Sequence, residues 1–118
     1  TLGQMVEVLK QRIQAIAANT GTQIELQPQH FVEPTLASPV VQTAIATVCA
    51  DLQLTHYSMP SRAIHDAQEI GRFTSMGMIF VPSQAGVSHA EDEYTSPEQC
   101  AQGADVLLHT LLRLDDQL

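Results

Sequence analysis

Apolar residues recur at helical spacing near the start of the chain and then change to strand-like spacing. The first stripe advances by four, four and three residues, which predicts a helix from about residue 3 to residue 19 with one apolar face. The stripe consists of Met5, Leu9, Ile13 and Ile16. Residues 23–27 then alternate polar and apolar side chains, which predicts a strand with one buried face and one face in water.

Two prolines interrupt the pattern after this strand. Pro28 and Pro34 bracket a stretch with neither spacing, and proline favours extended backbone or a turn over a continued helix. We therefore expect an extended connector here and a boundary between two domains.

Two further helices follow the connector, each with a recognisable start. Ser38 and Pro39 predict the start of a helix that runs to about residue 53, because serine caps a helix and proline suits its first turn. Ser96 and Gln99 match a capping box at the start of a last helix that runs to about residue 114. The faces expected to be buried are Val41, Ala44, Ile45, Val48 and Leu52 in the first helix, and Cys100, Ala104, Leu107, Leu111 and Leu114 in the last.

Shorter patterns of apolar residues lie between these two helices in the sequence. They predict a strand at 54–59, a helix of two turns within 64–73 and a strand at 76–81. Residues 76–81 contain no polar side chain, which is typical of a strand covered on both faces in a parallel sheet. From residue 38 onward the chain therefore predicts an α/β unit with helices on a sheet.

Charge and composition exclude several kinds of partner. The chain has 118 residues and a formal net charge of −8, which disfavours capture of DNA, RNA or anionic lipid because those ligands are themselves anions. No apolar run approaches the roughly 18 residues of a membrane span, and the first residues lack the basic region of a signal peptide. We therefore expect a cytoplasmic protein. Cys49 and Cys100 fall at apolar helix positions, which favours buried free thiols over a disulfide.

Two loops at the ends of predicted strands carry residues that suit chemistry. Ligand-binding groups collect at the carboxyl ends of strands in open α/β sheets, because the backbone there is exposed on a rigid support. One loop carries Ser61, Arg62, His65 and Asp66, and the other carries Ser88 and His89.

Each candidate has a structural and a functional interpretation. His65 and His89 could each act through a neutral imidazole, which binds zinc-like metals or moves a proton. The alternative is that each is an ordinary loop histidine that does neither. Asp66 suits the positive end of a helix, and Arg62 either binds a carboxylate or lies in solvent. The acidic residues 91–93 are typical of a solvated turn, and no paired His or Cys spacing completes a zinc site.

Four blocks of sequence together resemble a known family. They are HDA at 65–67, GMIFVPS at 77–83, SHAEDEYTSPE at 88–98 and the Leu-rich last helix. They resemble the hydantoinase/carbamoylase-type amidases of the M20 metallopeptidase-like superfamily, and the resemblance spans about Met59 to Leu114. That family includes N-carbamoyl-L-amino acid hydrolases, allantoate amidohydrolases and ureidoglycolate amidohydrolases.

The resemblance implies a fold and a domain order. The chain would be the C-terminal part of a metallopeptidase-like catalytic α/β domain, with helices packed on a mainly parallel sheet. The last helix and strand of an α+β lid domain would precede it. Residues 1–29 would end this lid and dimerisation domain, 30–37 would form a hinge, and 38–118 would belong to the catalytic domain.

The resemblance also implies roles for individual residues. His89 would be a ligand of one of two divalent metal ions in a full-length subunit, zinc or manganese, with nickel or cobalt also suitable. His65 would be the catalytic residue that contacts the substrate and polarises its carbamoyl or amide group, and we place Arg62 beside it as substrate-binding. The chain reads SRAIHDA where many members read SGAGHDA, which favours an allantoate-like substrate.

The function implied is hydrolysis of linear amide C–N bonds in a small ureido acid, most simply allantoate or an N-carbamoyl amino acid. The remaining metal ligands and the general base of the family have no counterpart in these residues, so we expect the isolated chain to be inactive. We expect a homodimer or higher self-association. The alternatives are a noncatalytic remnant that acts as an oligomerising module and, third, a metallopeptidase.

Overall fold

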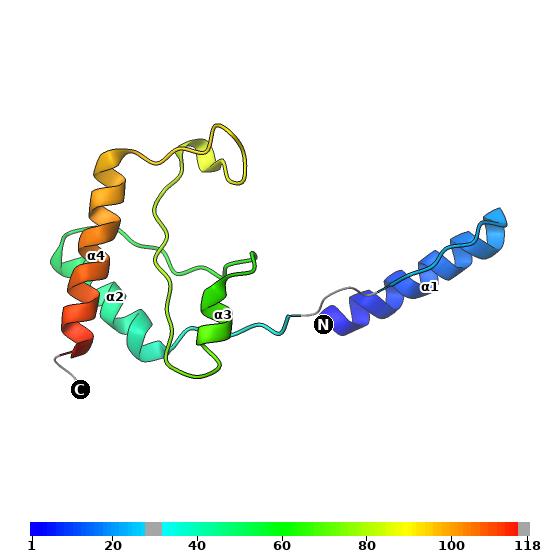
Figure 1. Ribbon diagram of the computed structural model, residues 1–118, viewed down its shortest axis with the longest axis horizontal. Helices are drawn as coiled ribbons and strands as arrows, with labels where there is room; N and C mark the ends of the chain where they lie inside the picture. Colours follow the sequence, from blue (N-terminus) through cyan, green and yellow to red (C-terminus); the bar gives the residue numbers. More distant parts are fainter. Residues whose placement is uncertain (28–31, 116–118) are drawn as a thin grey trace. The chain divides into compact units, whose positions relative to one another are not determined.

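The described residues, 1–27 and 32–115, form helices joined by irregular segments in the computed structural model (Figure 1). They divide into two compact units, Thr1–Val32 and Glu33–Leu118. Residues 28–31 of the predicted connector, and residues 116–118, lie outside the described part.

Among the described residues of the first unit there is one helix, α1 (Leu2–Thr20), where the sequence predicts one. The Thr1 hydroxyl accepts a hydrogen bond from the backbone N–H of Gln4, and the helix ends at Gly21 with a φ of 68°. The predicted apolar stripe is present, but Met5 is 70% exposed and no residue of α1 is buried. The stripe therefore has no partner within its own unit.

The second unit contains three α-helices, of which two match the predicted bounds closely. Helix α2 (Pro39–Asp51) begins at the predicted proline, and α4 (Pro97–Asp115) begins at the predicted capping box. In that box the Ser96 hydroxyl accepts from the N–H of Gln99 at 3.2 Å. Helix α3 (Asp66–Ile70) is shorter than the predicted two turns and is followed by Gly71. A short 3₁₀ helix, η1 (Gln84–Gly86), precedes α4.

The core of the second unit lies where α2 and α4 pack against each other (Figure 1). Val48, Cys49 and Val106 are buried at this contact, as is Ala44 on α2. Partly buried side chains pack around the cluster: Ile45, Leu52, Leu54 and Ile79. The inward face predicted for α2 is confirmed by this burial.

The predicted β-strands are absent from residues 1–27 and 32–115, so the structure does not confirm the sheet. Residues 23–27, 54–59 and 76–81 are irregular in these ranges. A strand exists only when its N–H and C=O groups pair with a neighbouring strand. Among the described residues, residues 76–81 make one backbone hydrogen bond. The Ser38 N–H donates to the carbonyl of Met76 at 2.7 Å. Residues 76–81 therefore have no ladder partner among residues 1–27 and 32–115.

The apolar run 76–81 nevertheless has a defined place, because it packs on helices α2 and α4. At Gly77 the backbone approaches Val41 of α2 so closely that an added Cβ would lie 2.5 Å from its Cγ1. At the other end Val81 lies directly against Gly103 of α4. The run is half-buried and not fully covered, since Phe80 is 54% exposed. The helices cover one side of a strand-like segment.

Helix α4 turns a different face toward α2 from the one that the sequence predicts. Val106 and Thr110 are the buried residues, whereas four members of the predicted face are exposed, namely Cys100, Ala104, Leu107 and Leu111. The expectation that Cys100 is buried was therefore wrong. The packed face is the one that contains Gly103, where the helix surface is low enough to admit Val81. The exposed Leu-rich face is a second apolar surface with no partner among the described residues.

None of the helices in the described ranges has the length and apolar character needed to cross a membrane.

We predict that Gly77→Val destabilises the second unit by about 1–3 kcal/mol, the usual cost of forcing extra atoms into a tight contact. The new side chain would collide with Val41 on α2. Thermal or urea unfolding measures the change, and Ser75→Val, at an exposed position two residues earlier, is the matched control. Equal stability of the two variants would contradict the packing described here.

Candidate functional site

His65 is fixed by contacts to its ring from two separate segments. The Ser61 hydroxyl lies 2.6 Å from Nε2 of the imidazole, and Phe80 packs edge-on against the ring with centroids 5.7 Å apart. Phe80 belongs to the run that packs on α2 and α4, so the histidine is tied to the rigid part of the unit. The imidazole is half-buried.

The backbone of His65 is fixed as well, because it caps helix α3. Its N–H donates to the side-chain oxygen of Gln68 at 3.0 Å, and its carbonyl accepts from the Gln68 N–H at 2.9 Å. The carbonyl of Gln68 in turn accepts from the Thr35 hydroxyl at 3.1 Å. This chain of hydrogen bonds anchors α3 to the segment before α2.

His89 lies at the exposed tip of the second loop in a backbone conformation that few side chains adopt. Its φ is 58°, in the left-handed region, where residues other than glycine pay roughly 1–2 kcal/mol. The Glu93 carboxylate accepts the His89 N–H at 2.7 Å and so stabilises this turn. The Ser88 hydroxyl lies 2.9 Å from Nδ1 of the imidazole, so Nε2 is the nitrogen not engaged by Ser88. A loop that holds a strained histidine in this way favours a functional role for it.

The loop that carries His89 is closed at its base. The Thr95 hydroxyl donates to the carbonyl of Pro82 at 2.9 Å, and the Gln84 N–H donates to the carbonyl of Tyr94 at 2.8 Å. These bonds join the two ends of the loop just before α4 begins. The position of the loop therefore follows from the packing of α4 and of the run before Pro82.

The residues present fit one ligand of a metal site and no more. Metal-binding histidines commonly use one ring nitrogen for the metal and the other for a hydrogen bond, as His89 and Ser88 would do. Within residues 1–27 and 32–115, however, no three His, Cys, Asp or Glu side chains are gathered to hold an ion. A complete site would need ligands from outside the described residues.

The other predicted candidates are not drawn into a common site. Among the described residues Arg62 makes no ion pair and is exposed, and Asp66 is exposed in the first turn of α3. The structure shows no hydrogen bond between His65 and His89 in those ranges. It therefore presents two separately built loops.

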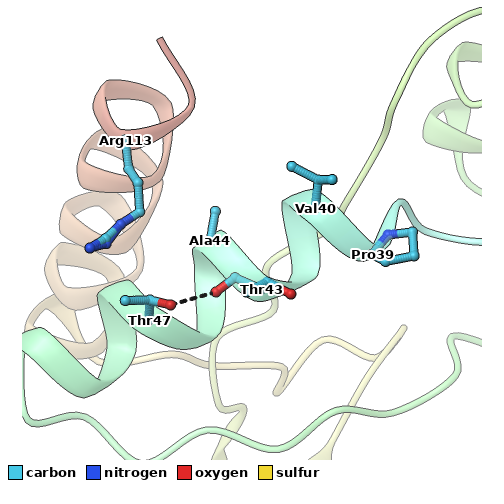
Figure 2. Close-up of a pocket in the computed structure, with 6 residues that line it drawn as sticks. All are labelled: Pro39, Val40, Thr43, Ala44, Thr47 and Arg113. Atoms are coloured by element: carbon cyan, nitrogen blue, oxygen red, sulfur yellow. Dashed lines mark hydrogen bonds between the residues drawn. The ribbon is translucent and has the colours of Figure 1, made fainter. Parts of the chain in front are cut away.

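An open groove between α2 and α4 contains none of the predicted site residues (Figure 2). It is lined by Pro39, Val40, Thr43, Ala44, Thr47 and Arg113. The Thr47 hydroxyl donates to the carbonyl of Thr43 at 2.9 Å, and the Arg113 guanidinium lies 3.5 Å from the Asp51 carboxylate. Because these polar groups are already paired, the groove belongs to the packing of the two helices.

Comparison with known proteins identifies the family to which the chain belongs. Residues 3–113 match the family described as peptidase family M20/M25/M40. The chain belongs to that family. The match includes both histidine loops and nearly all of α1, which lies before the four sequence blocks that carry the resemblance.

Curated relatives within this M20 family are named as amidohydrolases or hydrolases. An N-carbamoyl-L-amino acid amidohydrolase from Geobacillus stearothermophilus is 35% identical over 111 residues, which cover 94% of this chain and 27% of that protein. A ureidoglycolate hydrolase from Arabidopsis thaliana is 43% identical over 81 residues, or 69% of this chain and 17% of that protein. An allantoate amidohydrolase from Bacillus subtilis (strain 168) is 33% identical over 102 residues, or 86% of this chain and 25% of that protein. The chain thus spans about a quarter or less of the length of these relatives.

Sequence reasoning missed the roles of three side chains that shape the loops of this M20 family member. Phe80 was assigned only to a buried strand, and no sequence signal links it to His65. Glu93 was assigned to a solvated acidic turn, although its position four residues after His89 suits a hydrogen bond back to that residue. Ser61 was noted as a loop residue without a role, and its spacing of four from His65 was the available signal.

We predict that Glu93→Ala loosens the turn at His89, because the variant lacks the acceptor for the His89 N–H. The expected loss is about 1 kcal/mol of local stability. Amide NMR of the chain would report it as an upfield shift and faster hydrogen exchange at His89. Glu93→Gln keeps an oxygen acceptor and is the matched control. If the chemical shift and exchange rate of the His89 amide are unchanged in the Ala variant, Glu93 does not stabilise this turn.

Proposed function

We propose that this chain supplies one metal ligand and one substrate-contacting histidine to a metal-dependent amidohydrolase. The reaction proposed is hydrolysis of a linear amide C–N bond in a ureido acid, either allantoate or an N-carbamoyl amino acid. Membership of the M20 family and the names of the relatives, which are amidohydrolases, support the reaction class. The 43% identity to a ureidoglycolate hydrolase, together with the SRAIHDA block, supports a ureido acid of the allantoate type.

The observation that carries the proposal is the geometry of His89. Its backbone is held in a costly conformation by Glu93, and its Nδ1 is engaged by Ser88, so Nε2 is the ring nitrogen that we assign to the metal ion. A divalent ion bound there would act as a Lewis acid that polarises a substrate oxygen. Zinc or manganese is proposed for a pair of sites in the complete subunit, and nickel or cobalt would suit the same imidazole.

His65 is proposed as the catalytic residue that donates a hydrogen bond to the carbonyl oxygen of the substrate. Its ring is oriented by Ser61 and Phe80 before any substrate arrives, which lowers the cost of reaching the reactive arrangement. Arg62, exposed three residues earlier, is proposed to bind the substrate carboxylate through its guanidinium group.

The domain roles proposed are a lid and dimerisation segment at 1–29, a hinge at 30–37 and the catalytic domain from 38 onward. The division of the chain between Val32 and Glu33 supports a boundary in that region. The unpartnered stripe of α1 and the exposed Leu face of α4 support a homodimer or higher self-association, since packing would remove both surfaces from water. We propose that the chain alone is inactive, and the cytoplasmic location stays a prediction.

We predict that His89→Ala, in an active protein that contains this chain, removes one metal ion of the pair or weakens its binding by orders of magnitude. The variant loses a whole coordination bond. Metal content of the purified protein is the measurement, and the change of Glu91, Asp92 and Glu93 to Gln is the control that should keep full occupancy. Full occupancy in His89→Ala would reject the assignment, and depletion in the control would transfer it to the acidic turn.

We predict that His65→Ala in the same protein lowers turnover of allantoate or an N-carbamoyl amino acid by about two orders of magnitude or more, the scale for loss of one transition-state donor. Metal content should not change. The control is His56→Ala, because His56 is an exposed histidine outside both loops. Loss of metal or of folding in His65→Ala would mean that the residue is structural.

A further inference from the structure

The hydroxyl of Ser61 makes two contacts, and together they constrain where its hydrogen lies. Its oxygen accepts the N–H of Ala63 at 3.3 Å, and it lies 2.6 Å from Nε2 of His65. Since the Ala63 amide already donates to this oxygen, the hydroxyl hydrogen remains available to the imidazole. The separation of 2.6 Å also suits an O–H donor better than a ring N–H donor, which typically lies about 2.9–3.0 Å from its acceptor.

If the hydroxyl donates to Nε2, the ring proton of neutral His65 must lie on Nδ1. An imidazole has two nitrogens and one proton in its neutral form, so the partner of one nitrogen determines the state of the other. The reverse arrangement would place a ring N–H only 2.6 Å from the Ser61 oxygen, which is short for an N–H donor. Phe80 restrains the plane of the ring, so the nitrogen opposite Ser61 has a fixed direction.

We infer that Ser61 is a positioning residue that holds His65 in the Nδ1–H tautomer, so that the group offered to the substrate oxygen is Nδ1–H. This inference rests on the proposed role of His65 in binding the substrate carbonyl. It adds a second residue to the site and names the atom that donates. Ser61 itself does not contact the substrate.

The tautomer is measurable on the 118-residue chain, without metal or substrate. Long-range ¹H–¹⁵N correlation spectra of ¹⁵N-labelled chain, recorded near pH 8 where an ordinary histidine is neutral, distinguish Nδ1–H from Nε2–H. The His65 signals are assigned from their loss in His65→Gln. We expect the Nδ1–H pattern in the parent and in Ser61→Thr, which keeps the hydroxyl, and a change toward Nε2–H in Ser61→Ala. Ser58→Ala, at an exposed position in the preceding segment, should match the parent.

The second test measures turnover by an active protein that contains this chain. Ser61→Ala should lower kcat by about ten- to a hundredfold, the scale for losing a hydrogen bond that orients a functional histidine, and Ser61→Thr should restore most of it. An Nε2–H pattern in the parent overturns the inference, as does an unchanged pattern or unchanged turnover in Ser61→Ala. Full turnover in His65→Ala would instead remove the proposed function of the histidine, so the two failures are distinguishable.

Discussion

The second unit depends on how closely the apolar run 76–81 approaches helices α2 and α4. Gly77 lets the backbone of this run lie against α2, where a Cβ would collide with a valine side chain. The run then extends to both loops of interest: its Phe80 packs on the ring of His65, and its end leads directly into the loop that carries His89. One packing contact therefore determines where two otherwise separate loops lie.

Within these loops the two histidines are prepared in opposite ways. Ser61 engages Nε2 of His65, and Ser88 engages Nδ1 of His89, so each ring has a different nitrogen available. A donor to a substrate oxygen needs a protonated ring nitrogen, whereas a ligand to a metal ion needs an unprotonated one. Under the roles proposed above, the Ser61 hydroxyl would donate to Nε2 of His65, whereas the Ser88 hydroxyl would accept from Nδ1–H of His89 and leave Nε2 unprotonated for a metal ion.

The helices were predictable because their signals are local. The proline at 39 and the capping box that begins at Ser96 place the starts of α2 and α4 correctly. The sheet was not confirmed, because a strand such as 76–81 needs partners that the described residues do not provide, and the chain spans only about a quarter of its relatives' length. The packed face of α4 was mispredicted because Gly103, and not the Leu stripe, admits the neighbouring segment. Contacts between distant residues, such as the ring contact of Phe80 with the loop histidine, leave no sequence signal.

We propose above all that the chain provides a single metal ligand, through Nε2 of His89. A crystal structure of a metal-loaded protein that contains this chain, with anomalous scattering recorded at the metal edge, tests this proposal. We expect a metal peak about 2.0–2.1 Å from Nε2 of His89, if the ion is zinc, with Ser88 still within hydrogen-bond distance of Nδ1. Coordination through Nδ1, or by the carboxylates at 91–93 with His89 turned away, would contradict it.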